Sequence, residues 1–213
     1  MLPCLLRQKN LDRFVLNKYL SLIFSALIID QGTKFWVKLN MFYGEEIRVF
    51  DWFFILFTEN NGMAFGLEFG GEIGKYILSI FRLLAICALF LYLNFLFNQG
   101  TKKGVLISVS LILAGAIGNM IDSAFYGMLF TSSYGQLSSF ISGELWPGGY
   151  SSFLQGHVVD MLYFPLINSH FPSWVPWLGG EHFIFFRPVF NFADSYITIG
   201  VLNLLIFHRS FFK

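Results

Sequence analysis

Charged residues are scarce in this chain of 213 residues. Asp, Glu, Lys and Arg make up 13% of it, whereas a soluble domain carries about 25%. Hydrophobic residues reach 55%, aromatic residues 20%, and the mean hydropathy is +0.62. This composition excludes an ordinary soluble domain and indicates a membrane protein. The net charge of +1 also offers no basic surface of the kind that binds nucleic acid.

Cysteine is rare as well, since the chain has two, Cys4 and Cys87. They offer neither a disulfide framework nor a cluster of metal ligands. His157, His170 and His182 lie in loops without a His-Glu-x-x-His pattern or a cysteine partner, so a zinc site is not expected. We therefore expect neither a metal nor a cofactor.

The beginning of the chain resembles a secretory signal peptide, with basic residues ahead of the apolar run Tyr19–Ile29. No small-residue cleavage site follows, because Asp30, Gln31 and Lys34 come next. We therefore expect an uncleaved first membrane span.

Four segments are apolar enough to cross a membrane, and we expect spans at approximately 19–39, 76–97, 105–121 and 190–207. Residues 158–167 are apolar too, but they are short and are interrupted by Pro165. The expected fold is mainly α: one integral membrane domain over residues 1–213, with four transmembrane helices, a small exported β element and extended exported loops.

Orientation follows from the basic residues. Three segments, 1–18, 98–104 and 208–213, hold eight of the 14 Lys and Arg residues but a single acid, Asp12. The positive-inside rule places these segments, and both termini, in the cytoplasm.

Two segments are then exported. A β region is expected at approximately 44–68, because β-forming residues precede an Asn-Gly turn there. A loop insertion is expected at approximately 123–189. Its aromatic residues suit the membrane–water interface or a plain packed loop.

Two aspartates, Asp160 and Asp194, lie in apolar surroundings near the exported ends of these segments. A carboxylate against lipid is costly and is usually functional. Two carboxylates brought close share a proton, which suits hydrolysis, because the ionised acid takes a proton from water while the protonated acid polarises a carbonyl. Alternatively, each caps a helix or pairs with a base, and spacing alone leaves both interpretations open.

Other polar pairs have helical spacing. Asn119 and Asp122 are three residues apart, as are Asn191 and Asp194, so each pair shares a face. Such an amide orients a carboxylate, binds a substrate backbone, or bonds between helices.

Asp30 and Lys34 are four apart and are expected to form a structural ion pair. Charged groups inside spans also build proton relays, so a proton-coupled transporter or a membrane assembly factor is an alternative function. The small number of spans and the lack of inverted repeats disfavour it.

Five short motifs follow one another along the chain: Asp30-Gln31-Gly32-Thr33-Lys34, Asn60-Asn61-Gly62-Met63-Ala64-Phe65-Gly66, Gly115-Ala116-Ile117-Gly118-Asn119-Met120-Ile121-Asp122, Val158-Val159-Asp160 and Phe190-Asn191-Phe192-Ala193-Asp194. In this order they resemble the lipoprotein signal peptidases, the type II signal peptidases of bacteria. The resemblance implies a monomeric aspartic endopeptidase of the inner membrane, without a cofactor, that removes signal peptides from diacylglyceryl-modified prolipoproteins by cutting before the lipidated cysteine.

On this resemblance the catalytic pair falls on Asp160 and Asp194, at the exported face. Substrate binding or support of the site falls on Asp30, Lys34, Asn60, Gly62, Asn119, Asp122 and Asn191.

The chain departs from the family pattern in two ways. Ser123 follows Asp122, where many members carry arginine, and Arg82 or Arg187 is a candidate to take its place. The connection before Asp160 and the stretch 165–189 are longer than expected, and we expect these insertions to act as a lid or a lipid-facing platform.

Overall fold

The computed structural model describes residues 2–62, 71–141 and 148–212. Four long helices dominate this part of the chain: α1 (Leu2–Asn40), α2 (Gly71–Asn98), α3 (Lys103–Ile121) and α5 (Phe192–Phe207). The first three are long and apolar enough to cross a membrane, and α5 is a shorter apolar helix of 16 residues, about 24 Å. The predicted mainly helical membrane fold is confirmed.

Helix α3 continues beyond its expected end. A π-helical turn, η2 (Asp122–Tyr126), and a short helix, α4 (Gly127–Leu129), follow it directly. π-helical turns often occur at functional sites, and this one begins at Asp122. At the other end of the chain, α5 is followed by the 3₁₀ helix η3 (Arg209–Phe212).

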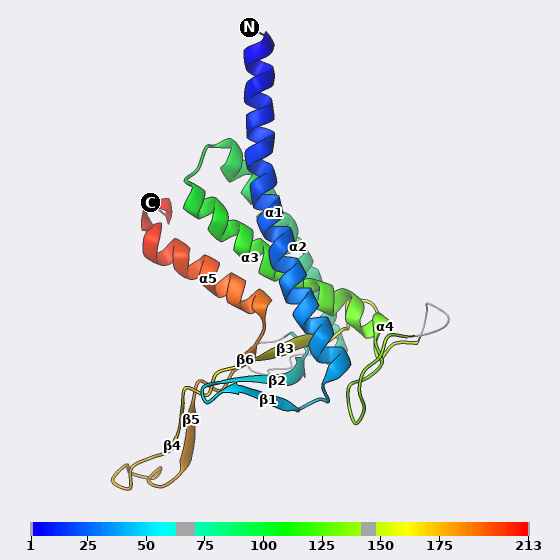
Figure 1. Ribbon diagram of the computed structural model, residues 1–213, viewed down its shortest axis with the longest axis vertical. Coiled ribbons are helices and arrows are strands. Elements are labelled where there is room, and N and C mark those ends of the chain that lie inside the picture. Colours follow the sequence, from blue (N-terminus) through cyan, green and yellow to red (C-terminus); the bar gives the residue numbers. More distant parts are fainter. Residues whose placement is uncertain (1, 63–70, 142–147, 213) are drawn as a thin grey trace.

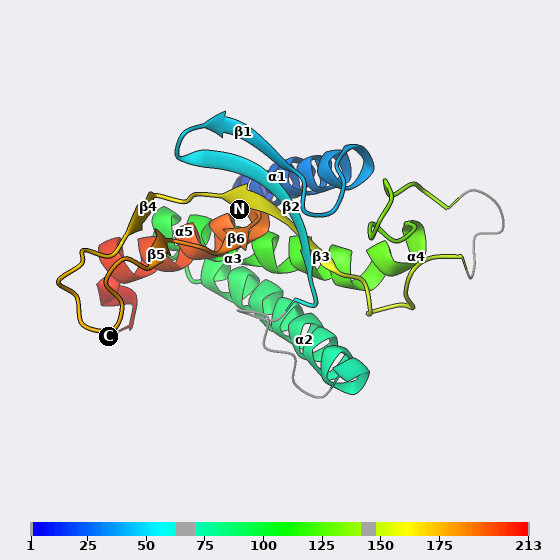
Figure 2. The same ribbon diagram turned by 90° about the horizontal axis from the view of Figure 1, so that it is seen from below.

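An antiparallel sheet lies across the end of the bundle that is remote from the two termini (Figures 1 and 2). Its order is β1 (Glu46–Phe50), β2 (Phe53–Asn60), β3 (Val158–Tyr163) and β6 (Val189–Phe190). Two of these strands come from the expected β region, of which residues 63–68 lie outside the described part. The apolar stretch rejected as a span supplies the buried strand β3.

Strands β4 (Ile167–His170) and β5 (His182–Phe185) form a separate two-stranded arm that projects away from the helices (Figure 1). Trp174 and Trp177 between these strands are 80% and 98% exposed. The base of the arm is closed by the β3–β6 pairing, in which Tyr163 faces Val189. The stretch expected as a loop is therefore a hairpin insertion.

The other insertion packs on the C-terminal end of α1, on the opposite side of the sheet from the arm (Figures 1 and 2). The ring of Phe35 contacts those of Phe130 and Phe140. The Lys38 ammonium donates to Ser133 Oγ at 3.0 Å. Residues 142–147 of this insertion lie outside the described part.

Small residues allow α3 and α5 to approach closely. A Cβ atom added at Gly115 would lie 2.2 Å from the carbonyl oxygen of Ala193, and one at Gly118 would lie 3.1 Å from the Cβ atom of Ala193. Only glycine permits these approaches. The first turn of α5, which carries Asp194, is therefore held against the third helix.

Candidate active site

The fold brings Asp160 and Asp194 together around the side chain of Asn191. Asp160 lies on β3 and is 4% exposed, while Asp194 is half-buried in the first turn of α5. The Asn191 amide donates to Asp160 Oδ1 at 2.7 Å, and its oxygen accepts from the Asp194 backbone N–H at 2.9 Å. One amide thus bridges the two predicted catalytic residues.

Asn191 differs from its expected place on a helix face. It is the N-cap of α5, and Asp194 Oδ2 accepts from its backbone N–H at 3.3 Å, which completes a capping box. The Asp194 carboxylate therefore caps the helix. Of the two interpretations that the sequence left open, helix capping is confirmed for Asp194, and its catalytic role stays a prediction.

Two further amides contact the carboxylates. Asn119 Nδ2 donates to Asp194 Oδ1 at 2.8 Å, and Asn60 Nδ2 donates to Asp160 Oδ2. These amides come from α3 and from the end of β2. Together with Asn191 at the start of α5, three separate elements therefore fix the orientation of the pair.

Lys34 lies fully buried behind the pair. Its ammonium is 2.8 Å from Asp122 Oδ2, 3.0 Å from Asp30 Oδ2 and 2.9 Å from Asn119 Oδ1. The predicted Asp30–Lys34 ion pair is confirmed, and it extends to Asp122. Asp30 Oδ1 also accepts from the Ala193 backbone N–H at 2.9 Å, which anchors the start of α5.

Gln31 is a functional neighbour that the sequence reasoning missed. Its Nε2 donates to Asp122 Oδ1 at 2.9 Å, while Asp122 Oδ2 accepts from the backbone N–H of Val159 at 3.2 Å. Asp122 thereby connects α1 to the strand that carries Asp160. The position of Gln31 inside the first motif is the signal that points to it.

Gly62 contacts the guanidinium group of Arg82. Its φ of +79° suits glycine, its carbonyl accepts from Arg82 Nη2, and a Cβ there would lie 2.5 Å from Nη1. Arg82 Nη1 is 3.4 Å from Ser123 Oγ, whereas Arg187 lies exposed between β5 and β6. Of the two candidate arginines, Arg82 is the one that reaches the site.

Burial and neighbouring charges act on the pKa of the Asp160 carboxyl group. Burial raises the pKa of the Asp160 carboxyl, and the nearby charge of Asp194 raises it further, to about 8. The opposing charge of Lys34 and the two amide hydrogen bonds reduce this effect without cancelling it. A buried carboxyl group with a raised pKa is suited to hold a proton for acid–base chemistry.

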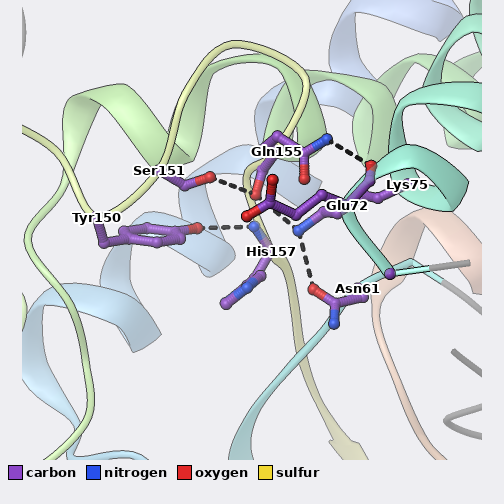
Figure 3. Close-up of a pocket in the computed structure, with 8 residues that line it drawn as sticks. Asn61, Glu72, Lys75, Tyr150, Ser151, Gln155 and His157 are labelled. Atoms are coloured by element: carbon purple, nitrogen blue, oxygen red, sulfur yellow. Dashed lines mark hydrogen bonds between the residues drawn. The ribbon is translucent and has the colours of Figure 1, made fainter.

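A cavity of about 340 Å³ is lined in part by Asn61, the residue that follows Asn60 (Figure 3). Lys75 donates to the Gln155 carbonyl at 2.6 Å and to Asn61 Oδ1 at 2.9 Å across it. His157 also lines it, with its Nδ1 3.2 Å from Glu59 Oε2. The remaining lining residues are Gly71, Glu72, Tyr150 and Ser151. Among the residues that the structure describes, no group of three or more His, Cys, Asp and Glu residues is arranged to hold a metal ion.

Comparisons with known proteins agree on one family. The family model described as signal peptidase (SPase) II matches residues 22–211. A lipoprotein signal peptidase from Porphyromonas gingivalis is 48% identical over 188 residues, which cover 87% of this chain and 80% of that protein. One from Amoebophilus asiaticus is 37% identical, over 91% of this chain and 78% of that protein.

Solved structures show the same fold. A bacterial membrane enzyme determined at 2.3 Å is 23% identical, with a TM-score of 0.57 over 91% of this chain and 88% of that one. A second, at 1.9 Å, is 24% identical, with a TM-score of 0.53 over 89% of this chain and 91% of that one.

Proposed function

The chain belongs to the signal peptidase II family, and on that premise we propose that it removes signal peptides from diacylglyceryl-modified prolipoproteins by cutting before the lipidated cysteine. Membership of the family makes the chain a multi-pass membrane peptidase. The proposal extends this to the substrate, to the bacterial inner membrane and to the residues that perform the cleavage.

The active site faces the exported side, and both termini are cytoplasmic. Two observations support this orientation. The ends of the chain lie away from the sheet (Figure 1), and the basic residues gather in the termini and in the connection between α2 and α3. Water is then available at the sheet end, where Asp160 and Asp194 lie.

The two aspartates activate water. In the proposed reaction, Asp160 holds the proton of the pair and Asp194 acts as the base. Asp194 takes a proton from water as the oxygen attacks the scissile carbonyl carbon, while Asp160 donates its proton to the carbonyl oxygen. The C–N bond then breaks, the leaving amine takes a proton from Asp194, and the carboxyl product returns one to Asp160.

The remaining motif residues position this pair. Asn191, Asn119 and Asn60 orient the carboxylates, and Gly62 forms the turn that follows Asn60. The buried charges of Lys34, Asp30 and Asp122 fix Asn119, the start of α5 and the backbone next to Asp160.

The bridge that Asn191 makes between Asp160 and Asp194 is the observation that carries the proposal. The Asn191 side chain contacts the Asp160 carboxylate and the Asp194 backbone N–H, and so holds residues from two elements in one site, where a shared proton is favourable.

The test is cleavage of a diacylglyceryl lipobox peptide by the purified full chain in detergent. Asp160→Asn and Asp194→Asn each remove one acid with little change of shape, so we expect cleavage to fall by more than about 1,000-fold. Asp51→Asn is the matched control, because this carboxylate is 86% exposed on the β1–β2 turn. Normal cleavage by either amide variant of the pair would refute the assignment.

A further inference from the structure

Arg82 is the one charged residue between Tyr76 and Asn98 on α2. A charged side chain inside an apolar helix is costly, and such residues usually face a polar site. The guanidinium of Arg82 is turned inward and lies on the Gly62 carbonyl and beside Ser123.

Arg82 reaches the reacting groups through a short chain of contacts. It donates to the carbonyl of Gly62, whose backbone N–H donates to Asn60 Oδ1. The same Asn60 amide donates through Nδ2 to Asp160. The guanidinium thus fixes a turn whose first residue is a hydrogen-bond donor to one of the two acids.

The site is also short of positive charge. Four carboxyl groups gather around it: those of Asp30, Asp122, Asp160 and Asp194. Lys34 from α1 contacts Asp30 and Asp122. Further along α1, Lys38 is matched by Glu59 of β2, which also contacts His157. Among the described residues, Arg82 therefore acts together with Lys34 to offset the negative charge of the reacting pair.

The electrostatic interactions of Arg82 also indicate a role at the aspartate pair. Arg82 interacts electrostatically with Asp194, Asp122 and Asp160, most strongly with Asp194. Because Asp194 is the acid that the proposed reaction needs in its ionised form, a neighbouring positive charge favours the reactive state.

We propose that Arg82 is a positioning residue of the aspartate pair, which holds the Asn60–Gly62 turn against Asp160 and supplies the positive charge beside Asp194. This inference rests on the proposed function. It assigns to α2 a part of the active site that none of the five motifs contains.

The experiment measures kcat and KM against pH for the full chain with the diacylglyceryl lipobox peptide. In Arg82→Gln the aspartate pair loses a neighbouring positive charge that favours its ionised state. We expect the acid limb of the kcat profile to move to higher pH by about one unit, with kcat reduced at least tenfold at neutral pH and KM nearly unchanged. In Arg82→Lys we expect the limb to keep its wild-type position, with a smaller loss of kcat.

A charge-relocation variant makes the test sharper. Ser123 Oγ lies 3.4 Å from Arg82 Nη1, so an arginine introduced at position 123 can place its guanidinium in the volume that Arg82→Gln vacates. We expect R82Q/S123R to recover at least half of the pH shift. Arg48→Gln is the matched control, since this side chain is 65% exposed on β1, and it should leave the profile unchanged.

Three results would overturn the inference: an unmoved profile in R82Q, a shift in R82K as large as in R82Q, or no recovery in R82Q/S123R. If R82Q also lowers the melting temperature, the pH profiles of R82K and R82Q/S123R decide whether the inference holds. Asp194→Asn is measured in parallel. Lack of cleavage by the wild-type chain defeats the proposed function, whereas cleavage that depends on Asp194 but not on Arg82 defeats this inference alone.

Discussion

Asp160 is the more deeply buried of the two aspartates, and both of its carboxylate oxygens accept hydrogen bonds from side-chain amides. Burial and then the charge of Asp194 raise its pKa to about 8. The carboxyl group is therefore protonated below that pH and loses its proton as the pH rises through it. The chemistry proposed for this residue requires the proton.

We predict that kcat falls on the alkaline side with a midpoint near pH 8, decreasing about tenfold per pH unit beyond it because one proton is lost. Single-turnover cleavage of the lipidated peptide between pH 6 and pH 10 measures this limb. A rate that stays level through pH 9.5, with the protein still folded by circular dichroism, would contradict the assignment of the proton to Asp160.

The sequence predicted some contacts between individual residues but left others open. The Asp30–Lys34 pair was predictable because helical spacing alone brings residues four apart together. The contact between Arg82 and Ser123 was left open against Arg187, because it depends on how α2 packs beside η2. The catalytic roles of Asp160 and Asp194 stay predictions, although the Asn191 side chain contacts both the Asp160 carboxylate and the Asp194 backbone N–H.

Among the elements, α3 and α5 make the closest approach that positions the site. Gly115 lies against the carbonyl oxygen of Ala193, the residue before Asp194, and a Cβ would be 2.2 Å from that atom. Backbone cannot yield as a flexible side chain can, so any added carbon displaces the first turn of α5.

Gly115→Ala is therefore predicted to destabilise the protein by about 1–3 kcal/mol, the usual cost of overpacking. Cleavage should fall more than stability does, because Asp194 moves with the helix. The measurements are the thermal unfolding midpoint and kcat in the same detergent. Gly32→Ala is the matched control on α1: a Cβ there meets nothing within 4 Å, so its stability should be unchanged or slightly raised. Equal behaviour of the two variants would refute the prediction.

The helices were more predictable than the strands. Long apolar runs specify spans by composition alone, and each expected span overlaps a helix of the structure. Strands β3 and β6 were expected to be part of a loop because each finds its partner far away along the chain, as with Asn60 and Val158. Local sequence carries little information about such pairing. The first helix also begins at Leu2, well before the expected span.

At the scale of the whole molecule, a buried polar cluster attaches the insertion that contains Ser133 to α1 and β2. Lys38 of α1 pairs with Glu59 of β2, and Ser133 of the insertion contacts both. Although burial alone would raise the pKa of Glu59, its contacts with His157 and Lys38 lower that pKa to about 2. The carboxylate is thus ionised at any pH well above 2 and is available to pair with the Lys38 ammonium.

Lys38→Met leaves the Glu59 carboxylate buried without its cation, so we predict a loss of about 3–5 kcal/mol in the free energy of unfolding. The segment 129–141 should also become more accessible to protease. Denaturant unfolding and limited proteolysis measure the two effects. The double variant K38M/E59Q should recover part of the loss, while Arg48→Gln, which breaks an exposed pair, should change stability by less than about 1 kcal/mol. An unchanged cleavage pattern in Lys38→Met would disprove the fastening role.

The β4–β5 arm begins just after β3 and ends just before β6, and these two strands are hydrogen-bonded neighbours. Because both ends of the arm are already fixed side by side, its length adds little to the cost of closing the loop. The arm can therefore be lengthened, shortened or replaced during evolution without changing the spacing between Asp160 and Asp194. The same property makes its tip, at Trp174 and Trp177, the natural position for grafting a fluorescent reporter or an affinity tag onto a working enzyme.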